Sequence, residues 1–121
     1  MKRDWNLIRE MLLAIEDQTE GGKILRRLDI PSSYPPAQVV GHLRLVNDAG
    51  FLEGNVKFHR DGVILVLHGL SWSGHDFLDT IWDNTVWEKT QEKAAQVGGS
   101  IALDTLKALA VKAAESLLGL S

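Results

Sequence analysis

The sequence contains no cysteine. This absence excludes disulfide bridges and thiolate-bound zinc, and it fits a reducing cytosol. The sequence also lacks any apolar run near the roughly 18–20 residues of a membrane span. Its first ten residues, MKRDWNLIRE, carry scattered charges where a signal peptide would have an apolar core. We therefore expect a cytoplasmic protein without a membrane-spanning segment.

Residues that bind metals or act as catalytic bases are few. The four histidines are His42, His59, His68 and His75. No two of them are four residues apart, and no carboxylate completes a zinc-protease motif around them. We expect neither a metal ion nor a cofactor.

The rest of the composition is that of a globular protein. The chain has 121 residues, of which 45% are hydrophobic and 24% charged, so it is long enough for one domain with a core. Residues 1–70 carry nine basic and nine acidic side chains, whereas residues 71–121 carry four and seven, which accounts for the net charge of −3. Every arginine lies at or before Arg60. Since arginine suits phosphate and base edges, this asymmetry points to the first half as the nucleic-acid-facing part.

Apolar spacing and cap residues predict the elements of the first half. Asp4 suits the N-cap of a helix over 5–18, with Ile8, Met11, Leu12 and Ile15 on one stripe. Lys23–Ile30 fits either a short edge strand or a helical turn. A helix over 36–49 begins at Pro36 and ends before Gly50, with Val39, Leu43 and Val46 facing inward.

Two extended runs follow this helix, FLEGNVKF and VILVLHGL. Asp61-Gly62 between them predicts a hairpin with a type I′ turn, in which both central residues have positive φ.

Three helices are expected after the hairpin. The first spans about 72–83, with Ser71 as its cap and Phe77, Leu78 and Ile81 inward. The second spans about 86–97, and Thr85 and Glu88 have the spacing of a capping box. Gly98-Gly99 predicts a turn, and Ser100 precedes a last helix that ends at Gly119. Its apolar face holds Leu103, Leu106, Leu109, Ala110, Ala113 and Leu117.

This order of elements predicts an α+β fold that is mostly helical. A helix that runs directly into a hairpin is typical of a winged helix-turn-helix, with the hairpin as the wing and residues 36–49 as the recognition helix. We expect a winged-helix domain over 1–83 and a C-terminal helical extension over 84–121, packed on it as a single globular unit.

The stretch VILVLHGLSWSGHDFL is also reminiscent of an α/β-hydrolase, whose His-Gly loop supplies an oxyanion donor. The nucleophile motif fails, because Gly69 and Ser71 are not followed by a glycine at position 73. No histidine follows His75, so the order Ser, Asp, His cannot be completed. The sequence therefore favours a strand, a turn and a helix cap, and we expect no enzymatic activity.

A helical wheel of residues 36–49 identifies a candidate DNA-contacting surface. Glutamine can read adenine and arginine can read guanine, and basic side chains on the wing can meet phosphate. The candidate contacts are Gln38, His42, Arg44, Lys57, His59 and Arg60, with Arg26 and Arg27 on flanking phosphates. His42 lies beside the apolar stripe, so local packing or capping is the alternative for this residue. The same helix face also holds Ala37, Gly41, Leu45 and Asp48, which leaves open that the fold serves only as a scaffold for protein contacts.

Tryptophans and the last helix provide candidate protein interfaces. Trp72 and Trp87 are expected to pack the hairpin against the C-terminal helices, and Trp82 to be exposed. The broad apolar face of the last helix needs a cover, either from its own domain or from a second copy in a homodimer. The candidate interface residues are Trp82, Leu106, Leu109 and Leu117.

Four segments carry a resemblance to a known family: MKRDWNLIREMLLAIE, VVGHLRLVNDAGFLEG, LSWSGHDFLDTIWDNTVWEK and the terminal LGL. They resemble domain-of-unknown-function family 2513, a bacterial and prophage-associated family similar to the small YjcQ-like winged-helix proteins. The resemblance implies a winged helix in a phage setting and no established activity. Gly41 departs from the family pattern, where a larger residue is common, and Ser71 replaces threonine.

Two hypotheses follow. The first is a small DNA-binding or transcription-associated regulator of phage or prophage origin that contacts double-stranded DNA. The second is a non-enzymatic adaptor, a regulatory or anti-defence factor that binds protein through the tryptophan-rich or C-terminal helices.

Overall fold

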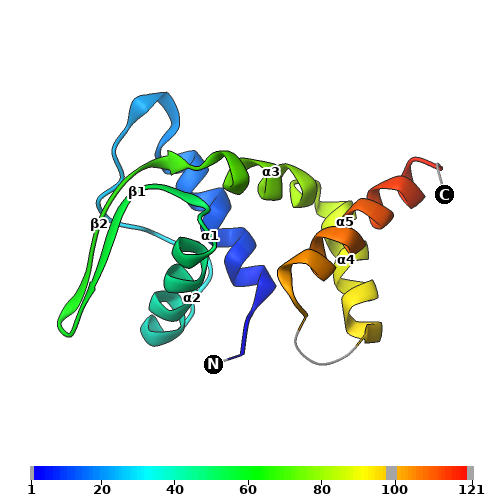
Figure 1. The fold of residues 1–121 in the computed structure, drawn as a ribbon, viewed down its shortest axis with the longest axis horizontal. Helices are drawn as coiled ribbons and strands as arrows, with labels where there is room; N and C mark the ends of the chain where they lie inside the picture. The colour runs from blue at the N-terminus through cyan, green and yellow to red at the C-terminus, as the bar shows by residue number, and fades with distance from the viewer. Residues whose placement is uncertain (1, 98–100, 120–121) are drawn as a thin grey trace. The chain divides into compact units, whose positions relative to one another are not determined.

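The fold is α+β, as the sequence predicts (Figure 1). A computed structural model describes residues 2–97 and 101–119 of the chain. These residues form helices and one two-stranded antiparallel sheet, in the order α1 (Trp5–Gln18), the 3₁₀ turn η1 (Glu20–Gly22), α2 (Pro36–Asp48), β1 (Leu52–His59), β2 (Gly62–Leu70), α3 (Trp72–Ile81), α4 (Asn84–Val97) and α5 (Leu103–Leu117). The expected turn at Gly98-Gly99 and the expected cap at Ser100 lie outside the described residues. None of the helices described is long and apolar enough for a bilayer crossing.

The chain divides into two compact units, residues 1–75 and residues 76–121. The boundary falls within α3, whereas the sequence suggested a boundary after that helix, at residue 83. Packing of the C-terminal part on the N-terminal part stays a prediction. Each unit has its own buried apolar residues.

Helix α1 forms as predicted, with the predicted cap. The Asp4 carboxylate accepts a hydrogen bond from the Leu7 backbone N–H at 3.2 Å. The apolar stripe is buried, including Leu7, Met11 and Ile15 at 0% exposure. This stripe is the centre of the first unit's core, to which Leu43 and Val46 of α2 and Leu65 and Leu67 of β2 also contribute.

A long connection, residues 19–35, joins α1 to α2. The segment Lys23–Ile30 forms neither the short edge strand nor the helical turn that the sequence allowed, because only Leu25 pairs with another strand. Leu25 exchanges two backbone hydrogen bonds with Leu67 of β2, both 2.9 Å long. Further along, Gln18 donates to the Asp29 carbonyl at 2.8 Å, and Ser32 donates to Glu10 at 2.5 Å. The connection is therefore tied both to the hairpin and to α1.

Tyr34, the only tyrosine of the chain, closes this connection. Burial raises the pKa of its phenol above the ordinary 10.0, and the negative charges of Asp4 and Glu10 raise it further. Because the folded state holds the phenol proton more tightly, its stabilising contribution is present below the unfolded pKa near 10 and is lost as the pH rises through the folded pKa.

An ultraviolet titration of tyrosinate absorbance should show Tyr34 ionising above the pH at which free tyrosine does. Glu10→Gln should lower this midpoint, because it removes a negative charge beside the phenol and leaves a weaker, uncharged acceptor for its hydrogen. Asp17→Asn, an exposed change on the same helix, serves as the control and should leave the midpoint unchanged. A wild-type midpoint at the value of free tyrosine would contradict this environment.

Helix α2 ends where the sequence predicts. Gly50 has φ of 78°, and the Phe51 N–H donates to the Val46 carbonyl at 3.1 Å, which is the Schellman closure of a helix. Phe51 is 3% exposed, so the chain turns at Gly50, buries this ring and enters β1 directly.

The hairpin is confirmed, but its predicted turn type is wrong. Arg60 and Asp61 form a two-residue turn between the paired residues His59 and Gly62. No described residue other than glycine has positive φ, so neither turn residue can have the conformation of a type I′ turn. Gly62 lies just after the turn, with φ of 151°.

A bulge interrupts the pairing between Glu53 and Gly54, and His68 of β2 has no partner there. Gly54 has φ of 135°, and a Cβ at this position would lie 2.2 Å from the Val66 carbonyl oxygen. Glycine is required because both the backbone conformation and the opposing strand exclude a side chain.

In the second unit, the predicted burial of Phe77, Leu78 and Ile81 is confirmed. The predicted capping box is wrong: Asp83 caps α4 by accepting from the Val86 N–H at 3.0 Å. Helices α4 and α5 pack against each other, and Leu106, Ala110 and Ala113 supply the buried residues of α5. Gly119, with φ of 74°, follows the helix as expected.

Candidate nucleic-acid interface

Arg44 forms a cation–π contact between α2 and the hairpin in the first unit. Its guanidinium carbon lies 4.2 Å from the centre of the Phe58 ring on β1. Arg44 is exposed, so the ring holds the planar cation at the surface rather than covering it. A cation stacked in this way keeps its edge N–H groups available to an acceptor such as phosphate or guanine. Sequence reasoning predicted the arginine but missed the phenylalanine below it.

The other predicted hairpin contacts lie on a different face. Side chains alternate along a strand, so Lys57 and His59 point opposite to Phe58. Burial follows this alternation, because Val56 and Phe58 are partly covered whereas Lys57 and His59 are exposed. Lys57 and His59 therefore do not share a surface with Arg44. Arg60 lies at the turn itself and is exposed.

Arg26 and Arg27 follow Leu25, the residue that pairs with Leu67 of β2. They therefore lie near β2 and are not part of α2. Both are exposed. Arg27 lies 3.6 Å from the Asp29 carboxylate, with the two side chains 90% and 77% exposed, so this ion pair is solvated and weak. Gln38 on α2 is half-buried, and its carbonyl takes part in a hydrogen bond with His42.

His42 is not a surface residue, which corrects its prediction as a DNA contact. Its side chain is 0% exposed. The Asp4 backbone N–H donates to Nε2 at 2.8 Å, so the hydrogen on Nδ1 is directed to the Gln38 carbonyl, also 2.8 Å away. The ring is therefore held by both nitrogens between the start of α1 and the first turn of α2. The buried stripe of α2 includes His42 beside Leu43, which agrees with the packing alternative for this residue.

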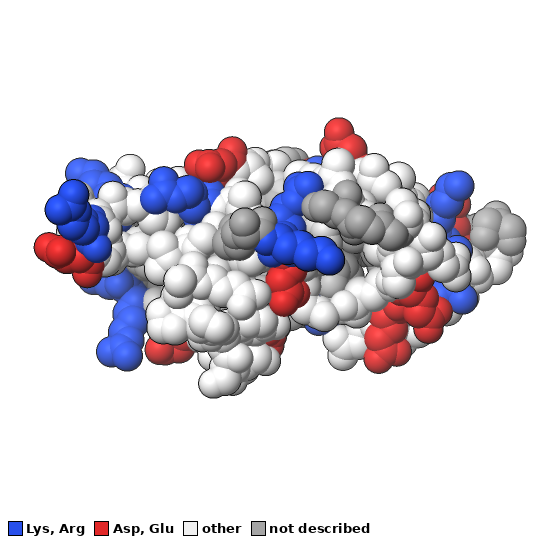
Figure 2. Space-filling model, turned by 90° about the horizontal axis from the view of Figure 1, so that it is seen from below, with Lys and Arg blue, Asp and Glu red and all other residues white. Residues whose placement is uncertain are grey.

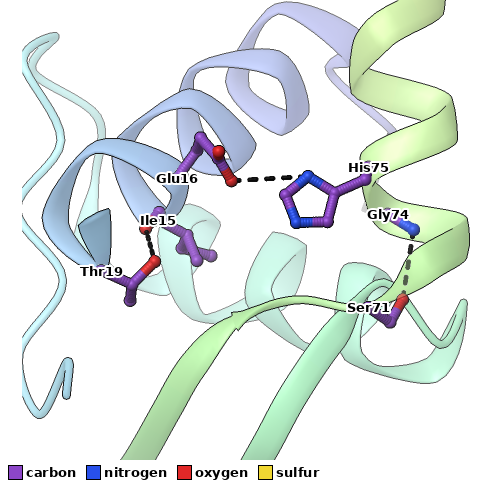
Figure 3. Close-up of polar contacts among 6 residues, drawn as sticks. All are labelled: Ile15, Glu16, Thr19, Ser71, Gly74 and His75. Atoms are coloured by element: carbon purple, nitrogen blue, oxygen red, sulfur yellow. Dashed lines mark hydrogen bonds and ion pairs between the residues drawn. The ribbon is translucent and has the colours of Figure 1, made fainter. Parts of the chain in front are cut away.

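The candidate hydrolase stretch is a structural joint (Figure 3). The Ser71 hydroxyl donates to the Gly50 carbonyl and accepts from the Gly74 N–H at 3.1 Å, so the predicted helix cap is confirmed. His75 faces Glu16 of α1 at 3.5 Å and not a serine. The Ser71 hydroxyl hydrogen is donated to a backbone carbonyl, which is not a general base. None of these contacts could therefore activate this serine as a nucleophile. Within residues 2–97 and 101–119, no three His, Asp or Glu side chains converge as a metal site would require.

Positive side chains lie around the hairpin but do not form a continuous patch. In Figure 2, Lys and Arg groups gather at the hairpin end, the left side in both views, with acidic and uncharged surface between them. Helix α2 also presents Ala37, Val40 and Asp48 to solvent beside Arg44.

Exposed tryptophans are the other feature that partner binding could use. Trp72 is 85% exposed, so the prediction that it packs the hairpin is wrong, and Trp82 is exposed as predicted, at 55%. Trp87 is buried. Among the predicted interface leucines, Leu117 is exposed and Leu109 half-buried, whereas Leu106, at 1% exposure, belongs to the core of the second unit.

Comparison with known proteins identifies relatives that match most of the chain. The family model described as "Hypothetical protein (DUF2513)" matches residues 2–100. A protein of Haemophilus influenzae (strain ATCC 51907 / DSM 11121 / KW20 / Rd), described as "Uncharacterized protein", is 32% identical over 111 residues, which cover 91% of this chain and 92% of that protein. No solved structure matches the chain.

Proposed function

The chain belongs to the family described as "Hypothetical protein (DUF2513)", and from its own structure we propose that it binds double-stranded DNA as a small winged-helix regulator. In this proposal α2 is the recognition helix and the β1–β2 hairpin is the wing. Arg44 and Gln38 contact the duplex from α2, and Arg60 contacts it from the hairpin turn. Arg26 and Arg27 meet flanking phosphates.

The stacking of Arg44 on Phe58 carries the proposal. An exposed arginine usually loses rotamer entropy when it binds a ligand. Here the ring 4.2 Å below holds the guanidinium in place on a helix that runs directly into the hairpin. This arrangement supports a cation presented for phosphate or a base edge.

Two features limit the kind of binding. Residues 19–35 separate α1 from α2, so the tight turn of a helix-turn-helix does not connect them. The exposed part of α2 also has few groups that read bases. We therefore expect contacts mainly with the phosphate backbone, with a dissociation constant of roughly 1–100 µM at physiological salt, as in sequence-independent binding.

Binding can be measured by fluorescence anisotropy with a labelled random duplex. We expect association at low salt that weakens steeply between about 50 and 200 mM salt, because phosphate contacts release counterions. Arg44→Ala with Arg60→Ala should weaken binding by about tenfold or more. Lys93→Ala with Lys112→Ala removes the same charge from the second unit and should leave binding nearly unchanged.

Thermal melting would show that both double variants remain folded. The proposal fails if no duplex binds at low salt, or if the arginine and lysine pairs have equal effects. Equal losses would mean that net charge rather than this surface attracts the duplex.

Protein binding is the second candidate, and the exposure of Trp72 favours it. A tryptophan that is 85% exposed is a typical anchor of protein interfaces. In this function the α2–hairpin arrangement is a scaffold, and failure of the DNA experiment would support it. The expected phage or prophage association stays a prediction.

A further inference from the structure

Strand β1 has a free edge. β2 pairs with β1 on one side and with Leu25 on the other. In the described part of the chain, β1 has no backbone hydrogen bond to any segment other than β2. An unpaired strand edge is a template for another strand.

The usual protections of such an edge are weak here. β1 contains no proline, and the extra residue of the bulge is on β2, so Leu52–His59 continue without an insertion. The exposed side chains of the strand include one acid, Glu53, and one base, Lys57. Charges of a single sign would repel a second copy, whereas two opposite charges permit one specific alignment.

Symmetry restricts how two β1 strands could pair. A twofold axis perpendicular to the sheet maps each face onto itself, and residues opposite each other in an antiparallel pair lie on the same face. Because side chains alternate between the faces, two opposed residues are an even number of positions apart in the sequence. One residue therefore lies midway between them, on the twofold axis, and faces its own copy. Glu53, Asn55 and Lys57 share one face, and Leu52, Val56 and Phe58 share the other.

Centring the pair on Asn55 satisfies both faces. Glu53 then lies opposite Lys57 of the second copy, and this pair occurs twice. Asn55 lies opposite itself, and two side-chain amides can hydrogen-bond to each other. On the other face Leu52 lies opposite Phe58. If one β1 strand slides by two residues along the other, both charge pairs are lost. Glu53 then lies opposite Asn55 for a shift in one direction and opposite His59 for a shift in the other.

We propose that β1 pairs with β1 of a second copy of this chain, antiparallel and centred on Asn55. The product is a four-stranded sheet with β2 at each outer edge. One strand edge buries less than the area of about 1,000 Å² that stable interfaces need, so the association is weak and requires a high protein concentration. This dimer differs from one through α5, and it does not depend on DNA binding.

Charge exchange tests the alignment. Analytical ultracentrifugation between about 10 and 500 µM should show the wild-type mass rising from 13.4 kDa towards twice that value. Lys57→Glu places glutamate opposite Glu53, and Glu53→Lys places lysine opposite Lys57, so each variant alone should associate at least about tenfold more weakly. An equimolar mixture of the two variants restores both opposite-charge pairs, and it should associate as a heterodimer about as strongly as the wild type.

Lys112→Glu makes the same charge change on α5 and should leave association unchanged. Circular dichroism would verify that every variant is folded. The proposal is overturned by a wild type that stays at 13.4 kDa at the highest concentration. It is also overturned if the mixture stays dissociated, or if Leu117→Glu and not Lys57→Glu separates the copies, which would place the interface on α5.

Discussion

His42→Ala is expected to lower the free energy of unfolding by about 3–5 kcal/mol. The side chain is fully buried, so its removal leaves a cavity. It also leaves the Asp4 N–H and the Gln38 carbonyl without their partner. A buried polar group without a partner costs about 1–3 kcal/mol by itself. Urea unfolding followed by circular dichroism would measure the loss.

Two further substitutions make this expectation specific to the position. His68→Ala removes an exposed histidine at the bulge of β2, and it should change stability by less than about 0.5 kcal/mol. His42→Gln keeps both an acceptor and a donor, so it should recover part of the loss. Equal stabilities of His42→Ala and His68→Ala would refute the bridging role of the buried ring.

Gly74→Ala should destabilise the first unit by about 3 kcal/mol. Alanine in place of glycine inside a helix normally stabilises it by about 1 kcal/mol, so the expected sign is reversed here. A Cβ at position 74 would lie 2.2 Å from the Phe51 carbonyl oxygen and 3.0 Å from the carbonyl carbon. The same oxygen accepts a hydrogen bond from the Ser71 N–H at 2.8 Å, so the backbone cannot move away without breaking this contact.

The matched control for Gly74 is its neighbour Ser73. Ser73→Ala changes an exposed residue in the same helical turn and removes two contacts of its hydroxyl, one of 3.1 Å to the Gly50 carbonyl and one of 3.2 Å to the Ser71 hydroxyl. Its cost should stay within about 1 kcal/mol. Urea midpoints of the two variants would separate close packing from general helix effects, and a Gly74→Ala protein as stable as the wild type would contradict the contact.

Local patterns predicted most of the elements correctly. The bounds of α1, the end of α2 at Gly50 and the hairpin all depend on signals within a few residues: a cap, a left-handed glycine or alternating apolar positions. The predictions failed where two local signals competed. Asp83 rather than Thr85 caps α4, because both residues can accept from a helix N–H and the sequence does not show which one does.

The candidate interface was predicted less well, because a surface depends on faces that distant residues cover. His42 lies beside the predicted apolar stripe but was also counted among the DNA contacts, whereas the start of α1 covers it and bonds to its ring. Arg44 was identified from its position on α2, but Phe58 became its partner only when the hairpin folded beside the helix. Trp72 was assigned to the core because aromatic residues usually are buried, whereas it is 85% exposed.

The sequence by itself determined the α+β class, the family and the helix cap at Ser71, since these depend on residue types in local order. Tertiary structure alone decided which polar residues are buried, which cations share a face and which strand edge stays unpaired. Those properties arise from contacts between segments far apart in the chain. Asp4 and His42 are 38 positions apart and yet share a hydrogen bond, and no local pattern records that distance.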